Sequence, residues 1–177
     1  GYPMPIAQLR TRRLTLRQIC AEDAPFLHEQ FGLDDQMHTY TGWNPYATLE
    51  QARATVQTQV EECESGLSYC WAVEADDEPV GTVSAYELDS AQSKIEVGVS
   101  IIRSAWGRGF ATEALACALA YLAEQEGIRH IVAWAASENI GSLKALTKTG
   151  MQQTSVEKNA LRVGDQTFDK VWFEYQR

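Results

Sequence analysis

The strongest constraint on this chain is a glycine-rich turn at 106–113, which lies between a strand-like and a helix-like segment. The run 94–101 before it alternates apolar and polar residues, and an apolar stripe at helical spacing follows it. Backbone N–H groups in the first turn of a helix lack intrahelical partners and carry the positive end of the helix dipole, so they can hold a pyrophosphate. Gly107 and Gly109 would let the backbone approach such a ligand closely. The pattern therefore predicts an anion cradle at this turn.

Two other interpretations of the same turn need to be weighed. Gly-x-Gly before a helix is also typical of dinucleotide sites and of plain tight turns. The dinucleotide fingerprint needs a third small residue three positions after Gly109, where Thr112 stands instead. A P-loop needs a Gly-Lys-Ser/Thr triplet, which the chain lacks. The turn alone leaves the anion cradle and the plain turn both open.

Length and composition limit the class of protein. A chain of 177 residues with 45% hydrophobic and 22% charged residues suits a single domain, 1–177, with a substantial core. No apolar run approaches the roughly 18 residues of a membrane span, and the N-terminus lacks the apolar segment of a signal peptide. We therefore expect no membrane association.

Charge and metal-binding residue types exclude further classes. A net charge of −9 argues against nucleic acid as a partner, because phosphate binding requires a basic face. The four cysteines show no Cys-x-x-Cys spacing, and the three histidines lie far apart. We expect no metal site and a reducing, cytoplasmic location.

Hydrophobic periodicity and turn residues predict a mixed α/β sheet of the α+β class, with about seven strands and helices on both faces. Strand, helix and strand follow one another around the glycine turn, which favours a parallel pairing there. We expect strands at 13–19, 69–75, 79–88, 94–101, 131–135, 151–158 and 167–175, and helices beginning at 21–23, 48, 111 and 139.

Four landmarks in this order resemble the GNAT superfamily of acyl-CoA-dependent N-acyltransferases. Within it they resemble the RimJ/RimL type, which acetylates ribosomal-protein N-termini and related amines. The landmarks are 16–19 with Glu22 and Asp23, 43–46 before the second helix, 106–115, and 139–142 leading to Gly150 and Met151. The resemblance covers nearly the whole chain. It implies the GNAT fold, an antiparallel meander with a parallel, splayed central pair.

The resemblance implies acetyl-CoA as cosubstrate, with its pyrophosphate on the backbone amides from Gly107 to Thr112. Its pantetheine arm would pair with the preceding strand like an added strand. Val99 and Ile101 would equally suit ordinary core packing, and Asn139 is a good helix N-cap in any case. Trp106 replaces the family's usual Gln or Arg. The expected coenzyme A contacts are Val97, Val99, Ile101, Trp106, Gly107, Arg108, Gly109, Phe110, Ala111, Thr112, Asn139 and Ser142.

The implied reaction is attack of a neutral amine on a thioester carbonyl, which needs a proton acceptor, oxyanion stabilisation and a proton for the leaving thiolate. Glu96 is the candidate base, and its alternative is a charge paired with Lys94 or a neighbour. Ser142 is the candidate donor to the sulfur, and its alternative is positioning alone. Leu146 occupies the position where many GNAT enzymes have a tyrosine, which excludes phenolic acid catalysis from there.

An aromatic loop with Trp43 and Tyr46 resembles the segment beside the acceptor cleft in the RimJ/RimL branch. Aromatic walls suit an amine, and the alternative is a loop that is anchored by its own aromatics. Four acidic residues would add a negative rim that favours a cationic peptide or a polyamine, namely Asp34, Asp35, Glu87 and Asp89.

These features predict an acetyl-CoA-dependent N-acetyltransferase, acting as a monomer or homodimer on a protein N-terminal amine or on a small amine such as a polyamine or antibiotic. One alternative is an acyl-CoA-binding regulatory protein, which would be indifferent to the loss of Glu96 and Ser142. A dinucleotide-dependent oxidoreductase is the other, and the missing third small residue counts against it.

Overall fold

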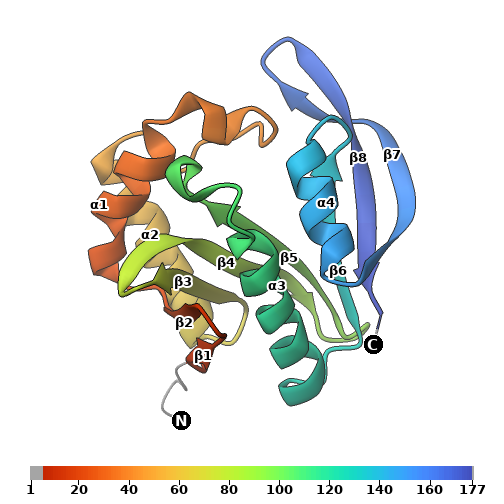
Figure 1. Cartoon of the computed structure of the whole chain (residues 1–177), viewed down its shortest axis with the longest axis horizontal. Coiled ribbons are helices and arrows are strands. Elements are labelled where there is room, and N and C mark those ends of the chain that lie inside the picture. Colours follow the sequence, from red (N-terminus) through yellow and green to blue (C-terminus); the bar gives the residue numbers. More distant parts are fainter. Residues whose placement is uncertain (1–5, 177) are drawn as a thin grey trace.

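The computed structural model describes residues 6–176, and these form a mixed eight-stranded sheet flanked by helices (Figure 1). The strand order across the sheet is β1-β2-β3-β4-β5-β6-β8-β7. The strands are β1 (Leu9–Arg10), β2 (Leu14–Gln18), β3 (Tyr69–Ala75), β4 (Glu78–Asp89), β5 (Lys94–Ile101), β6 (His130–Ala136), β7 (Met151–Val163) and β8 (Gln166–Tyr175). The helices are α1 (Ala24–Leu27), α2 (Leu49–Glu64), α3 (Phe110–Ala120) and α4 (Ile140–Lys148).

The predicted order of elements is confirmed, with three differences in extent. The two-residue β1 was not expected and makes the eighth strand, and β7 runs to Val163 instead of ending near 158. The first helix is much shorter than its capping signal suggests. A 3-10 turn (Ala21–Asp23), the four residues of α1 and a π-helical turn (His28–Gly32) divide that segment between them.

The two faces of the sheet are covered by different helices. Figure 1 shows α3 and α4 in front of the sheet and α2 behind it. The stripe of α3 is buried in the larger core cluster with the inward residues of β2 to β6, as its helical spacing predicts. A second cluster lies beneath α1 and α2, where Ala52, Val56 and Cys63 of α2 point inward. Helices therefore flank both faces, as expected.

β5 and β6 are parallel neighbours that soon part. Their pairing covers only Lys94↔His130, Ile95↔Ile131 and Glu96↔Val132. Beyond Glu96, β5 continues along β4, whereas β6 continues along β8. The central pair is thus splayed, and the backbone of β5 beyond Glu96 lies open on its β6 side.

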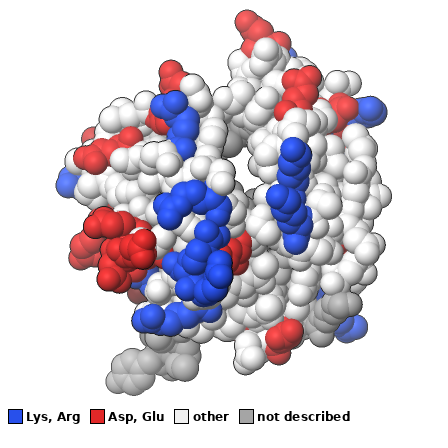
Figure 2. Space-filling model, viewed as in Figure 1, with Lys and Arg blue, Asp and Glu red and all other residues white. Residues whose placement is uncertain are grey.

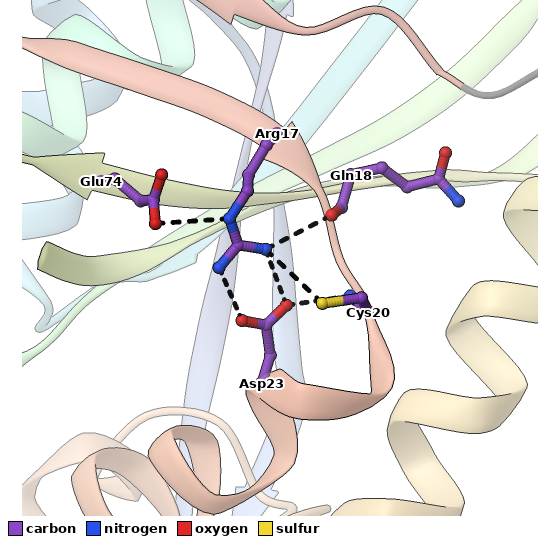
Figure 3. Close-up of polar contacts among 5 residues, drawn as sticks. All are labelled: Arg17, Gln18, Cys20, Asp23 and Glu74. Carbon is purple, nitrogen blue, oxygen red and sulfur yellow. Dashed lines mark hydrogen bonds and ion pairs between the residues drawn. The ribbon is translucent and has the colours of Figure 1, made fainter. Parts of the chain in front are cut away.

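A partly buried ion pair ties the first helical turn to the sheet (Figure 3). The Arg17 guanidinium on β2 donates to both carboxylate oxygens of Asp23, at 2.7 and 3.0 Å, and lies 3.3 Å from Glu74 on β3. The Cys20 N–H also donates to Asp23, at 2.9 Å. Burial alone would raise the pKa of Asp23, but the hydrogen bonds from Arg17 and Cys20 outweigh it and hold that pKa below its usual value.

Candidate active site

A cleft of about 310 Å³ lies where β5 and β6 part. β4 and β5 contribute one side, while β6 and the start of α4 contribute the other. The segment between α1 and α2 completes it. Its lining residues are Phe31, Met37, His38, Tyr40, Thr41, Trp43, Pro45, Tyr46, Thr82, Ser84, Tyr86, Val97, Gly98, Val99, Ser100, Trp134, Ala135, Ala136, Asn139 and Ser142.

Glu96, the predicted base, lies at the last paired position of β5 before the splay. Tyr86 is its cross-strand partner on β4, and the Tyr86 hydroxyl donates to Glu96 Oε2 at 2.7 Å. Tyr86 itself lines the cleft. Burial raises the pKa of Tyr86, and the hydrogen bond and charge of Glu96 raise it further, so this phenol stays a proton donor at neutral pH. Glu96 thus has a neighbour as its partner, since it accepts a hydrogen bond from Tyr86, and its role as a base stays a prediction.

The start of α4 brings two predicted residues to the opposite side of the cleft. Asn139 is the N-cap, and its side-chain oxygen accepts a hydrogen bond from the Ser142 N–H at 3.3 Å. Both residues line the cleft. The capping interpretation of Asn139 is confirmed, and the contacts of Asn139 and Ser142 with coenzyme A stay a prediction.

The glycine turn has the backbone conformation of an anion cradle. Gly107 and Gly109 have φ values of 81° and 78°, which L side chains rarely adopt. Gly109 is the N-cap of α3, so the first N–H groups of this 11-residue helix point out beyond it. A Cβ at Gly107 would meet no atom within 4 Å. The turn is therefore open to a ligand, and its conformation depends on glycine.

Basic side chains lie on both sides of this cradle. Figure 2 shows Lys and Arg gathered over the N-terminal end of α3 and along α4, with a hollow between them. Near α3, the guanidinium groups of Arg13 and Arg108 lie 4.7 and 4.4 Å from the Phe110 ring centroid. On α4, Lys144 and Lys148 line an exposed groove. An acidic protein thus presents a locally positive surface where phosphates are expected.

The remaining predicted coenzyme A contacts lie in three different environments. Val97 and Val99 line the cleft, whereas the Ile101 side chain is only 5% exposed and belongs to the core. Trp106 is 52% exposed, and its indole N–H donates to the Ile101 carbonyl at 2.7 Å. The Phe110 side chain is buried, so only the backbone of this residue is available to a ligand at the turn. Ala111 and Thr112 lie partly exposed in the first turn of α3.

The aromatic loop combines an anchored residue with an exposed one. Tyr46 packs into the cluster beneath α1 and α2, and its hydroxyl accepts from Gln59 at 3.2 Å. Burial raises the pKa of Tyr46 to about 12. Trp43 is 68% exposed, yet both residues line the cleft. The anchoring interpretation therefore describes Tyr46, and Trp43 is available to a ligand.

The expected acidic rim does not face the cleft. None of its four members is among the lining residues, and the Asp34 carboxylate accepts from Arg103 Nε at 2.8 Å. That hydrogen bond holds the pKa of Asp34 below its usual value. The rim was predicted from two separate acidic pairs, Asp34 with Asp35 and Glu87 with Asp89, and a position in the sequence does not fix where a side chain lies.

Most residues that line the cleft were not predicted from the sequence, among them Tyr86 and Trp134, and neither was Arg13 beside the glycine turn. The alternation of β4 was a usable signal for Tyr86, because Thr82, Ser84 and Tyr86 share one face of the strand. Arg13 bonds Glu113 on α3 at 2.8 Å, a contact between residues far apart in the chain. Within residues 6–176, no His, Cys, Asp or Glu side chains cluster in a way that could hold a metal, and no helix is long and apolar enough to cross a membrane.

Comparison with known proteins gives consistent matches. Residues 13–152 match the family described as the acetyltransferase (GNAT) domain. The chain is 31% identical over 150 residues to the N-acetyltransferase YoaA of Bacillus subtilis (strain 168), covering 84% of each. It is 28% identical over 167 residues to the N-acetyltransferase p20 of Bacillus licheniformis, covering 93% of each. In structure it is similar to RimL, a ribosomal protein acetyltransferase in complex with coenzyme A, with a TM-score of 0.88, 19% identity and coverage of 95% of this chain and 97% of that one.

Proposed function

Because this chain belongs to the GNAT acetyltransferase family, we propose that it moves the acetyl group of acetyl-CoA to a primary amine by direct attack in a ternary complex. One observation carries the proposal. The splay of β5 and β6 opens a cleft that is lined by Tyr86, Asn139 and Ser142, and Tyr86 donates to Glu96 at the last paired position of β5. The turn between β5 and α3 supplies the cradle beside it.

The residues present fit a coenzyme A thioester. Its pyrophosphate would lie against the first turn of α3, at Gly107 to Thr112, where the helix dipole and unpaired N–H groups favour an anion. Arg108 and the α4 lysines would add charge. The pantetheine arm would lie along the open side of β5 at Val97 and Val99, and Asn139 would bond one of its amides. When bound, the thioester supplies the activated acetyl group.

Glu96 is the group that we assign to proton transfer from the amine, directly or through water. The amine must lose a proton to become a nucleophile, and a carboxylate within reach can accept it. Tyr86 fixes one carboxylate oxygen by its hydrogen bond, which leaves Oε1 for the amine or water. Backbone N–H groups near Val97 to Val99 would stabilise the oxyanion.

Ser142 is the group that we assign to the departing thiolate. The C–S bond breaks as the amide bond forms, and the sulfur leaves with the electron pair. A hydroxyl in the first turn of α4 would donate a hydrogen bond to that sulfur, which either protonates it or holds it in place. A Ser142→Ala variant removes both roles together, and a lower kcat in it would support action of this hydroxyl on the thiolate.

The acceptor, location and assembly are also part of the proposal. The RimL neighbour acts on a ribosomal protein. By this likeness we propose a protein N-terminal amine as acceptor, with a small amine such as a polyamine or antibiotic as the second candidate. We further propose a cytoplasmic monomer or homodimer that does not bind nucleic acid.

Calorimetric titration with acetyl-CoA, CoA and NAD tests the cosubstrate. We expect micromolar binding of acetyl-CoA to the wild-type protein and its loss in Gly109→Glu, which places a charged side chain in the cradle. Gly164→Glu is the matched control, because Gly164 also has a positive φ of 60° but lies in the β7–β8 turn with nothing within 4 Å of a Cβ. Absence of CoA binding to the wild type would remove the transferase proposal, and NAD binding instead would favour the oxidoreductase.

A further inference from the structure

The cleft is lined without a single formally charged side chain. None of the residues that line it is Asp, Glu, Lys or Arg. We infer that the acceptor amine is attached to an uncharged, apolar or aromatic group, and that polyamines and other polycations are poor acceptors. This inference rests on the proposed function and narrows it to one substrate class.

Two apolar walls face this space. Phe31 and Tyr46 belong to the cluster beneath α1 and α2, with ring centroids 6.5 Å apart. Tyr40 and Trp134 pack instead against the small cluster around Phe168, where the rings of Tyr40 and Phe168 meet edge to face at 5.4 Å. Both walls are anchored in packed clusters, so they present fixed apolar surface to a ligand.

The floor between the walls is polar but neutral. Thr82, Ser84 and Tyr86 project from one face of β4, and all three line the cleft. The Ser84 and Cys70 side chains lie 3.4 Å apart, and Tyr86 donates to Glu96. Hydroxyls of this kind form hydrogen bonds with an amide or hydroxyl, as donor or as acceptor. They do not neutralise the charge of an ammonium group.

A second positive charge on the acceptor would find no counter-charge here. Among the described residues no Asp or Glu lines the cleft, and Glu96, which is bonded to the lining residue Tyr86, is the carboxylate that we assign to the reacting amine. An ammonium elsewhere in the cleft would lose its hydration without an ion-pair partner. Aromatic faces do attract cations, but the Trp134 ring already carries Lys170, whose Nζ lies 4.4 Å from the ring centroid. The lining therefore favours apolar groups over cationic ones.

A series of amino-acid amides tests the inference, because their α-amines are chemically alike while the side chains differ. Acetylation of leucinamide, phenylalaninamide, alaninamide, lysinamide and spermidine would be followed by release of CoA thiol. We expect kcat/KM for leucinamide or phenylalaninamide to exceed that for alaninamide by about tenfold. Lysinamide and spermidine should fall below alaninamide. Equal or better use of lysinamide or spermidine would overturn the inference.

A charge swap on the floor provides a second test. Thr82→Asp adds a carboxylate between the apolar walls, and Thr82→Asn is the control of nearly the same shape without charge. We expect Thr82→Asp to raise the kcat/KM ratio of lysinamide to leucinamide by about tenfold, and Thr82→Asn to leave that ratio nearly unchanged. No change in the ratio for Thr82→Asp would contradict the uncompensated-charge argument.

Binding separates this inference from the proposed function. Tryptophan fluorescence, to which Trp43 and Trp134 in the cleft contribute, reports amide binding without turnover. If acetyl-CoA does not bind or no amine is acetylated, the transferase proposal fails. Tighter binding of leucinamide than of lysinamide to the same protein would still support the apolar acceptor site. The reverse order would overturn it.

Discussion

Glu96 and Tyr86 show how a single hydrogen bond links the sheet to the proposed chemistry. We expect Glu96→Gln to lower kcat/KM by about 100-fold or more, because it removes the proton acceptor. Tyr86→Phe should lower kcat by about tenfold and leave the KM for acetyl-CoA unchanged, since it frees the carboxylate without removing it.

Steady-state kinetics of the two single variants and the double variant would check this coupling. Because Tyr86 acts through Glu96, the double variant should be little worse than Glu96→Gln alone. Multiplicative losses would show that Tyr86 acts independently. Unchanged turnover in Glu96→Gln and Ser142→Ala would favour the acyl-CoA-binding regulatory protein.

Asn139 serves two functions that substitution can separate. Asn139→Ala should destabilise the protein by about 0.5–2 kcal/mol, because the first turn of α4 loses its cap. Asn139→Asp keeps a capping oxygen and should therefore retain stability, but it loses the amide N–H donors. We expect the KM for acetyl-CoA to rise in both variants. Urea unfolding alongside kinetics would check this, and a normal KM in Asn139→Asp would leave Asn139 as a cap only.

The Arg17–Asp23 pair makes the first helical turn sensitive to acid. The folded-state pKa of Asp23 lies below its unfolded value of about 3.9, so its stabilising contribution is fully present above that value. That contribution disappears as the pH falls through 3.9 toward the folded pKa. Asp23→Asn should cost about 1–3 kcal/mol at pH 7, and the difference from wild type should shrink at pH 3.

Urea unfolding of wild type and Asp23→Asn at the two pH values would measure this effect. Asp35→Asn is the control, because Asp35 is exposed and lies in the 3-10 turn that follows α1. It should change the free energy of unfolding by less than about 0.5 kcal/mol at either pH. A difference for Asp23→Asn that is independent of pH would show that packing, and not the charge, is responsible.

The molecule as a whole is acidic, yet it is basic beside the glycine turn where we propose that the pyrophosphate binds. We therefore expect the KM for acetyl-CoA to rise when the ionic strength of the assay is raised from about 0.05 to about 0.5 M, while kcat changes little. Lys144→Gln with Lys148→Gln should raise the KM at low salt and flatten its salt dependence. Lys158→Gln, on β7 and paired with Asp169, is the control. A salt response equal to wild type in the double variant would exclude the α4 lysines.

Much of the fold was predictable from local patterns. The stripe of α3, the alternation of β5 and the caps of α2 and α4 each occur within a few consecutive residues. The length of β7 was not predictable, because residues 152–159 are all exposed and show no burial alternation. The short β1 is held by its pairing with β2, which only the folded chain supplies.

The site was predictable where one segment carries it and not where segments meet. The glycine turn and Asn139 each belong to a contiguous motif. The contact of Tyr86 with Glu96 depends on the register of β4 against β5, which shifts between Tyr86 and Asp89. Trp134 reaches the cleft only because β6 leaves β5. Register and strand divergence are properties of the assembled sheet, so a single sequence does not specify them.

The three residue pairs that join β5 to β6 form a short junction, which divides the sheet into two halves. One half of the sheet consists of β1 to β5, and the other half consists of β6 to β8. The apolar cluster beneath α1 and α2 packs against the first half. The small cluster around Phe168 consists of residues from the second half together with Tyr40. Each of these two clusters supports one side of the opening, whereas the largest core cluster contains residues of both halves and joins them. We therefore expect chains of this architecture to change their acceptor preference through substitutions in the two smaller clusters, while the largest cluster keeps the two halves together.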